Sequence, residues 1–266
     1  MNIPTIENPP ENVPGKWYPT DFDFVHSLST TLHTISPSVF LLENALSSET
    51  CDALISQMVN CGVHTPVGVH GYMGVEGEIG SMRATGWSEA LAKRFWVIFA
   101  PFFHPRKMNE FTATDWFADH QRKEHIFWKA IGISPLLRFM SYTEGGEHYG
   151  HYDMGYDYGD GRRTLMSFVV YLTDVQDGEG GKTRFLQDKQ ENIPVRHRVH
   201  DDWRRRAEEE EILCAVRPQK GHVLFFDHRL CHDVEPYSGT TPRIIIRGDV
   251  VYWSMKEEEY VRMENT

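Results

Sequence analysis

The sequence predicts a mainly β protein with supporting helices, in which the strands form an antiparallel sandwich or an open barrel. Short apolar stretches bounded by Gly, Asp and Pro follow one another from Leu136 onward, a pattern typical of strands. They read "LLRFMSYTEGG", "LMSFVVYLTD", "KTRFL", "HVLFFD" and "RIIIRGDVVYW". Two segments with a helical period of apolar residues precede them, which places the helices in the N-terminal half.

Residues 1–36 are expected to be an extended arm, because several prolines forbid a regular helix there. These prolines are Pro4, Pro9, Pro10, Pro14 and Pro19. The segment "SPSVFLLENAL" then predicts a strand that leads into a turn. "SSETCDALISQMV" predicts a helix capped by Ser47 or Ser48.

Residues 37–135 are expected to support a core formed by residues 136–254. The glycine-rich run from Gly62 to Gly86 predicts loops between short strands. "SEALAKRFWVIFAPFF" predicts a second helix that Pro101 and Pro105 end. Its buried face is expected to consist of Leu91, Phe95, Ile98 and Phe99.

Residues 187–211 interrupt the strands and are almost wholly charged. We expect a surface insertion in which Asp201 or Asp202 caps a short helix, because a solvated charge run is more common than a binding patch.

The composition excludes several classes of function. The formal net charge of −11 argues against nucleic acid and membrane partners. The four cysteines lack CxxC spacing, so neither a disulfide framework nor a thiolate zinc site is expected. The chain has no apolar signal core and no apolar run of membrane-spanning length, so a reduced, cytoplasmic protein is expected.

The stretch "GEHYGHYDMGYDYGDG", residues 146–161, contains a candidate metal site. His151 and Asp153 are separated by one residue, so they share a face of a strand, and a histidine and a carboxylate can share a metal ion. His232 follows an apolar strand and precedes a turn, where a further ligand would lie; His228 is nearby. Two histidines and one carboxylate form the facial triad of non-haem Fe(II) oxygenases.

Two other histidines compete for this site. His200 and Asp202 repeat the His-x-Asp pattern, but no apolar strand surrounds them. His148 could join His151 and Asp153 in a zinc site, although a solvent-facing His148 is the preferred interpretation.

From about Leu136 to Trp253 the chain resembles the Fe(II)/2-oxoglutarate-dependent dioxygenases of the prolyl 4-hydroxylase-like branch. The matching stretches are "LRFMSYTEGGEHYGHYD", "GRRTLMSFVVYLTD", "GEGGKTRFL", "VRPQKGHVLFFDH" and "HDVEPYSGTTPRIIIRGDVVY". With "FLLENALSSETCDALI", the resemblance covers most of residues 37–253. It implies a double-stranded β-helix (jelly roll) with helices supporting one sheet.

The resemblance also implies roles for particular residues. The iron ligands would be His151, Asp153 and His232, which are the catalytic residues. Arg243 would bind the distal carboxylate of 2-oxoglutarate, with Arg247 as the alternative because the segment before Arg243 is longer than is usual in the family. The same pocket would be lined by Tyr142, Tyr171 and Thr183.

Substrate-binding candidates follow from the two-residue period of strands. Arg138 shares a face with Tyr142, and Arg247 shares one with Arg243, so both arginines are expected to point into the barrel mouth. The alternative is that each is a half-buried ion-pair partner, for example of Asp249 or Glu235. Three tyrosines on the loop beside the metal are expected either to cover substrate or to pack at the rim; they are Tyr152, Tyr156 and Tyr158.

The implied reaction decarboxylates 2-oxoglutarate with dioxygen and hydroxylates a C–H bond, with ascorbate as a candidate reductant. A carboxylate ligand at Asp153 disfavours halogenation, because halogenases of this class usually lack it. Desaturation and ring closure are other outcomes of the same chemistry. The substrate would be a prolyl residue of a peptide or protein, or a free amino acid or other small metabolite. A non-catalytic metal-binding jelly roll is the alternative from another class of protein.

Overall fold

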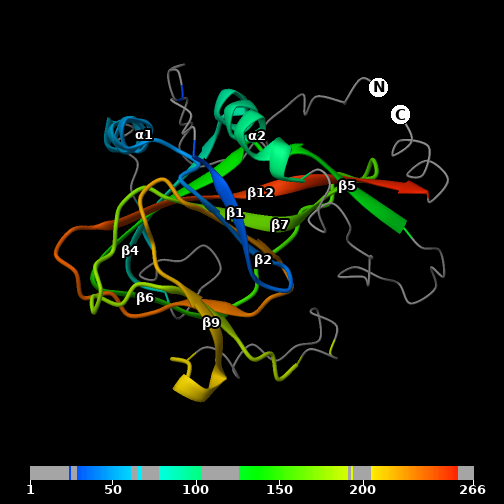
Figure 1. Ribbon diagram of the computed structural model, residues 1–266. Helices are drawn as coiled ribbons and strands as arrows, with labels where there is room; N and C mark the ends of the chain where they lie inside the picture. The colour runs from blue at the N-terminus through cyan, green and yellow to red at the C-terminus, as the bar shows by residue number, and fades with distance from the viewer. Residues whose placement is uncertain are drawn as a thin grey trace.

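The structure is a computed structural model that describes residues 24, 29–60, 65–67, 78–103, 126–190, 193 and 205–256. Its strands form one antiparallel sheet that curls into a nearly closed barrel, with two helices on one side (Figure 1). The mainly β fold with supporting helices is therefore confirmed, and its architecture is that of a double-stranded β-helix.

Twelve strands and two α-helices make up the described part of the chain, together with one short 3-10 helix, η4 (Glu209–Glu211). The helices are α1 (Ser48–Asn60) and α2 (Glu89–Phe103). The strands are β1 (Thr31–Ser36), β2 (Val39–Glu43), β3 (Thr65–Val67), β4 (Glu78–Trp87), β5 (Ile126–Ile133), β6 (Leu136–His151), β7 (Arg162–Tyr171), β8 (Thr183–Leu186), β9 (Ile212–Val216), β10 (Val223–Asp227), β11 (His232–Val234) and β12 (Arg243–Lys256).

The strand order around the sheet is β1-β2-β10-β7-β12-β6-β11-β8-β9. β12 pairs with β6 on one side and with β7 on the other, and β5 pairs with its C-terminal part. β4 pairs with β6, and β3 pairs with β4. Segments far apart in the sequence, such as β6 and β11, therefore lie side by side.

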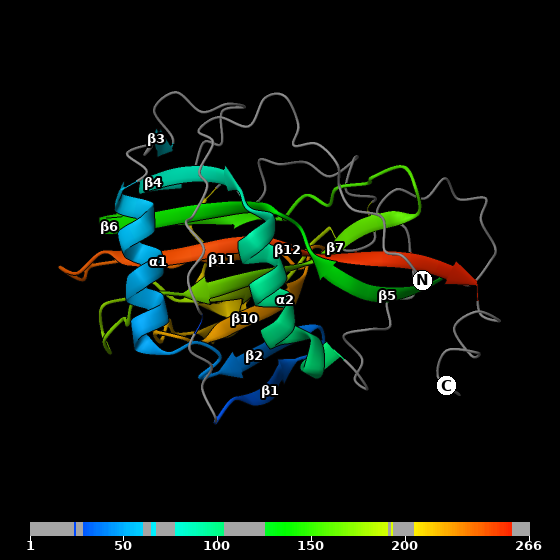
Figure 2. The same ribbon diagram turned by 90° about the horizontal axis from the view of Figure 1, so that it is seen from above.

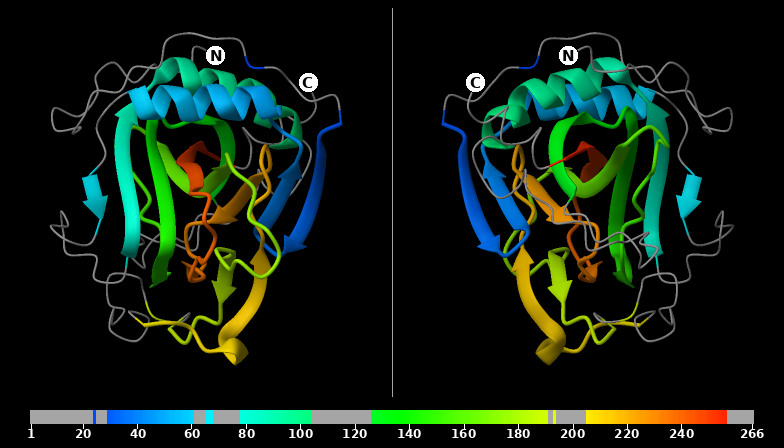
Figure 3. Two further views of the ribbon diagram at one scale, coloured as in Figure 1. Left: turned by 90° about the vertical axis from the view of Figure 1, so that its left-hand side faces the viewer. Right: turned by 90° about the vertical axis from the view of Figure 1, so that its right-hand side faces the viewer.

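Both helices lie across the same side of the barrel, as the end-on view shows (Figures 2 and 3). Ser47 caps α1, because its Oγ accepts a hydrogen bond from the Thr50 amide at 3.2 Å. Phe99 of α2 packs edge-on against Phe225 of β10 with the ring centroids 5.0 Å apart. The main apolar core is thus buried between the helices and the outer face of the barrel.

The inner face of the barrel carries a second apolar cluster and the polar residues of the candidate site. Side chains alternate along each strand, so Phe168 and Val170 of β7 face the helices while Val169 and Tyr171 face inward. The inward-facing residues of all strands therefore line the interior of the barrel, which is where a small ligand would bind.

Two expectations about element boundaries were wrong. Pro101 lies inside α2, which continues to Phe103, because the buried ring of Phe103 packs edge-on against Phe225 at 5.5 Å. The expected arm, residues 1–36, includes β1, which pairs with β2 and so belongs to the sheet. Residues 1–23 and 25–28 of the arm lie outside the described residues.

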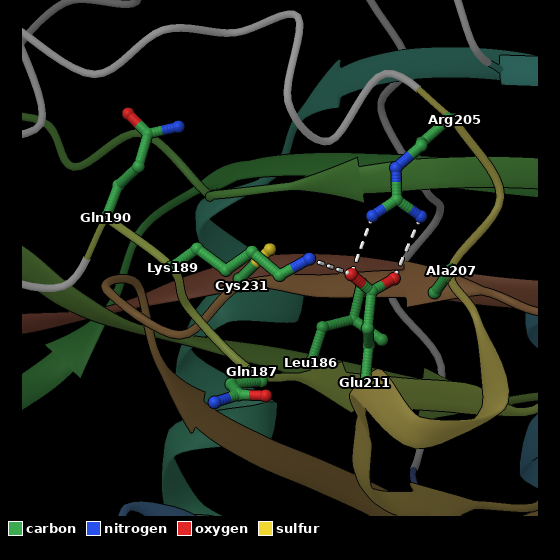
Figure 4. A pocket seen from close by; sticks show the side chains of 8 residues that line it. All are labelled: Leu186, Gln187, Lys189, Gln190, Arg205, Ala207, Glu211 and Cys231. Carbon is green, nitrogen blue, oxygen red and sulfur yellow. Dashed lines mark hydrogen bonds and ion pairs between the residues drawn. The ribbon is translucent and has the colours of Figure 1, made fainter.

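The charged insertion is described only in part. A helix capped by Asp201 or Asp202 would lie outside the described residues, and η4 is found nearby at 209–211. Lys189 and Arg205 both donate to Glu211 at 2.6 Å and border a small pocket (Figure 4). Lys189, Arg205 and Glu211 are therefore paired with one another, whereas Arg206 pairs with Glu147 of β6.

Within the described part of the chain, neither helix has the length and apolar composition needed to cross a membrane.

Candidate metal centre and co-substrate pocket

His151, Asp153 and His232 converge on one point inside the barrel. His151 ends β6, Asp153 follows two residues later, and His232 begins β11, whose antiparallel pairing with β6 sets it opposite His151. One ligand atom from each residue lies within 4.8 Å of the others. The three residues predicted from sequence are thus brought together.

Backbone carbonyls orient both histidines. Nδ1 of His151 donates to the Tyr149 carbonyl at 2.8 Å, and Nδ1 of His232 donates to the Leu230 carbonyl at 2.9 Å. Because a carbonyl oxygen only accepts hydrogen bonds, Nδ1 carries the hydrogen and Nε2 keeps its lone pair for a metal. Burial lowers the pKa of His151 to about 4 and also lowers that of His232, which keeps both rings neutral.

Asp153 is held by Arg247 and Ser167. The guanidinium donates to both carboxylate oxygens, from Nη2 to Oδ1 at 2.8 Å and from Nε to Oδ2 at 3.0 Å. Ser167 donates to Oδ2 at 2.5 Å. Burial alone would raise the pKa of Asp153, but the positive charge of Arg247 holds it well below its usual value.

Asp249 contacts the arginine that holds Asp153, together with two further donors. It accepts hydrogen bonds from Arg247 at 3.2 Å, from Arg138 at 3.3 Å and from Nε2 of His228 at 3.2 Å. Arg138 and Arg247 lie directly opposite each other on β6 and β12, a pairing of like charges that Asp249 offsets. The ion-pair alternative with Asp249 is therefore what the structure shows for both arginines, while Glu235 contacts Lys182.

The donor set fits a ferrous ion. Two neutral imidazoles and one carboxylate are the ligands of the facial triad in non-haem iron oxygenases. With three protein ligands, a ferrous ion held here would have positions left for further ligands. His148 lies outside this converging group, so the zinc alternative with His148 is not supported.

The expectation of a solvent-facing His148 was wrong. Only 7% of this residue is exposed, and its ring stacks on that of His151 with the centroids 3.8 Å apart. A β-bulge is the cause: the three-residue step from His148 to His151 on β6 lies opposite a two-residue step on β11. The additional residue in β6 turns both histidines to the inner face.

Arg243 forms a second polar site on the inner face. It is 1% exposed, with Nε donating to the Gly181 carbonyl at 2.7 Å and Nη2 to Oγ1 of Thr183 at 3.2 Å. Its guanidinium lies 4.9 Å from the ring centroid of Tyr142 and 5.9 Å from that of Tyr171. The residues predicted for 2-oxoglutarate are therefore in contact with one another.

The guanidinium of Arg243 is incompletely satisfied. Nη1 has no hydrogen-bond partner among the described residues, and none of them forms an ion pair with Arg243. Burial accordingly lowers the pKa of Arg243. A buried charge of this kind requires an anion, and the distal carboxylate of 2-oxoglutarate fits that requirement.

Tyr156 belongs to an exposed apolar rim beside the metal ligands. It is 56% exposed and packs edge-on against Tyr158, with the ring centroids 4.7 Å apart. Met154, directly after Asp153, is 78% exposed. The loop after the metal-binding strand thus presents apolar groups to solvent next to the site.

Sequence reasoning missed Ser167, the bond between His228 and Asp249, and the position of His148. A lone serine in the apolar run "LMSFVVY" was a usable signal for Ser167, because a polar residue in a buried strand needs a partner. The other two depend on strand register and on a bulge, which the local sequence does not reveal.

Comparisons with known proteins agree with this geometry. Residues 137–250 match the family model described as "2OG-Fe(II) oxygenase superfamily". The matched segment, which is less than half of the chain, contains His151, Asp153, His232 and Arg243. The protein is thus a 2-oxoglutarate-dependent oxygenase, and its cofactors are Fe(II), 2-oxoglutarate and dioxygen.

Several solved structures are similar to this chain at low sequence identity. OsALKBH1 aligns with a TM-score of 0.53 and 12% identity, over 82% of this chain and 99% of its own. A Pseudomonas putida prolyl-4-hydroxylase gives 0.48 and 15%, over 80% and 91%. The viral collagen prolyl hydroxylase of Paramecium Bursaria Chlorella virus-1 gives 0.46 and 17%, over 81% and 96%. No curated protein sequence matched the chain.

Proposed function

We propose that the protein hydroxylates a prolyl residue of a peptide or protein. The observation that carries the catalytic part is the position of the metal triad and of the partially satisfied Arg243 on the same inner face of the barrel. In this proposal His151, Asp153 and His232 hold the iron, and residues 136–254 form the catalytic unit that residues 37–135 support.

The co-substrate would be held at its far end by Arg243. Its guanidinium is fixed by Gly181 and Thr183, and Tyr171 also donates to Thr183 at 2.9 Å, so the site is formed before the ligand arrives. A charged hydrogen bond of this kind contributes about 1.5–3 kcal/mol.

Iron and 2-oxoglutarate, once bound, supply the oxidation that converts a C–H bond into an alcohol. The chain orients the reactants. The Tyr149 and Leu230 carbonyls fix the two imidazoles, and Arg247 and Ser167 fix the carboxylate of Asp153. The buried walls of the pocket exclude water from the reacting groups.

Two observations support a peptide rather than a small anionic metabolite as substrate. Arg138 and Arg247, the cations expected to bind such an anion, both pair with Asp249. Met154 and Tyr156 instead offer an exposed apolar rim beside the site, as expected where a larger partner docks. The choice of proline rests on the resemblance of the sequence to the prolyl 4-hydroxylase-like branch.

Anaerobic reconstitution tests the catalytic part. Purified protein with Fe(II) and 2-oxoglutarate should develop the weak visible charge-transfer band of the chelate, and His151→Ala should lack it. Succinate release in air, with ascorbate present, would then be compared for prolyl peptides and free amino acids. Folded wild-type protein that binds iron without giving the band would instead be a non-catalytic metal-binding jelly roll.

A further inference from the structure

His148 is a buried polar side chain beside the metal ligands. Neither of its ring nitrogens bonds to any described residue, whereas His151, His228 and His232 each make such a bond. Its Nε2 is fully shielded from solvent. Leaving a buried donor or acceptor unsatisfied costs about 1–3 kcal/mol, so its retention beside the metal site points to a ligand that bonds to it.

Strand register locates this nitrogen relative to Arg243. His148 lies opposite Val234 on β11, and Val234 lies opposite Thr183 on β8. Residues directly opposite one another share a face of the sheet, and Val234 belongs to the inner apolar cluster. His148 and Thr183 are thus in one row of the inner face, about 10 Å apart at two inter-strand spacings.

The neighbouring row contains the metal ligands. His151 lies opposite His232, which lies opposite Phe185. His148 stacks on His151 with an interplanar angle of 22°, so its ring lies at the metal end of its row, while Thr183 and Arg243 lie at the other end. A dicarboxylate held at one end by Arg243 and at the other by the metal therefore extends along this row.

We propose that His148 binds the keto-acid carboxylate of 2-oxoglutarate through an Nε2–H···O hydrogen bond. This rests on the proposed placement of the distal carboxylate against Arg243. A carboxylate only accepts hydrogen bonds, so the ring donates from Nε2 and leaves Nδ1 as an acceptor. A neutral donor orients the carboxylate without adding a charge beside the metal.

Binding of 2-oxoglutarate to Mn(II)-loaded protein, measured by calorimetry without oxygen, tests the proposal. His148→Phe keeps the aromatic stack on His151 and removes the donor, and should weaken 2-oxoglutarate binding about tenfold. His148→Gln keeps an N–H donor and should recover part of that loss. His222→Phe, at a buried histidine just before β10, is the matched control and should bind as wild type does.

Two further measurements locate the contact. The affinity for Mn(II) alone should be unchanged in His148→Phe. 2-Oxopentanoate keeps the keto-acid end and lacks the distal carboxylate; it should lose the same factor in His148→Phe and lose nothing in Arg243→Met.

Unchanged 2-oxoglutarate affinity in His148→Phe would overturn the proposal, and so would an equal loss of Mn(II) affinity, which would make His148 only a support for His151. Failure of the catalytic part of the proposed function is distinguishable, because the wild-type protein itself would then bind no 2-oxoglutarate. Failure of the prolyl assignment alone would leave this binding measurement unchanged.

Discussion

Arg243 is a single residue whose charge is buried without a matching acid among the described residues. We predict that Arg243→Met raises the KM for 2-oxoglutarate about 10- to 100-fold, because it removes a charged hydrogen bond of about 1.5–3 kcal/mol. Succinate formation at varied 2-oxoglutarate measures this. Metal affinity is the control and should not change. If Arg247→Met alone raised this KM, the assignment of the two arginines would be reversed.

The site residues predicted from sequence were those with local signals. A two-residue spacing placed His151 and Asp153 on one face, and the place of His232 after an apolar strand made it a candidate ligand. The resemblance added Arg243. The role of Arg247 could not be predicted in this way, because its contact with Asp153 joins β12 to the loop after β6. Such a contact follows from tertiary structure and not from periodicity.

At the scale of elements, β12 and β6 face each other with Arg247 opposite Arg138, and Asp249 bonds to both. We predict that Asp249→Asn lowers the free energy of unfolding by about 3–5 kcal/mol, the usual cost of breaking a buried ion pair. It should also weaken Mn(II) binding, because the uncompensated arginines repel the cation. Denaturant unfolding and metal titration measure the two effects.

Asp227→Asn is the matched control for this change. Asp227 is a buried acid at the end of β10, and Arg229 is its ion-pair partner among the residues that the structure describes. Asp227→Asn should lower the free energy of unfolding without changing the affinity for Mn(II). Equal effects of the two substitutions on the metal would show that Asp249 has no particular relation to the site.

Close packing between β12 and β7 gives a second prediction at this scale. A Cβ on Gly248 would lie 2.4 Å from the ring of Phe168, whereas a Cβ on Gly132 of β5 would meet nothing within 4 Å. Gly248→Ala should therefore destabilise by about 1–3 kcal/mol through overpacking. Gly132→Ala should be close to neutral, and equal melting temperatures of the two variants would contradict the prediction.

Most elements were predictable from sequence because their apolar periods are strong. Strands β6, β7, β8, β10 and β12 and both helices follow this rule, whereas β9 and β11 were not predicted. The exceptions depend on tertiary contacts. β1 is a strand because it pairs with β2. α2 continues beyond Pro101, where the ring of Phe103 packs against Phe225. The apolar period within a segment does not show which distant strand or side chain the segment will contact.

For the whole molecule, the candidate site connects strands that are distant in sequence. The metal residues come from β6, the loop after it and β11, and the co-substrate residues come from β6, β7, β8 and β12. Binding should therefore stabilise the barrel as a unit. We predict that Mn(II) at 100 times its Kd raises the free energy of unfolding by about 2.7 kcal/mol.

Thermal melts with and without Mn(II) measure this effect, which should amount to several degrees for a chain of this size. A chelator should reverse it, and adding 2-oxoglutarate should extend it only when the metal is present. His151→Ala should abolish the response. A shift that persists in His151→Ala would mean that the metal binds elsewhere.

The bulge between His148 and His151 has a consequence for how such barrels diverge. In a regular strand, Tyr149 and Glu147 would share the face of His151. Here His148 shares that face, and Glu147 pairs with Arg206 of the insertion. The single additional residue decides which side chain faces the ligand. Removing one residue there would change the chemistry of the pocket while leaving the His-x-Asp motif intact. Strand length, as well as residue identity, is thus a variable on which selection for a new ligand can act.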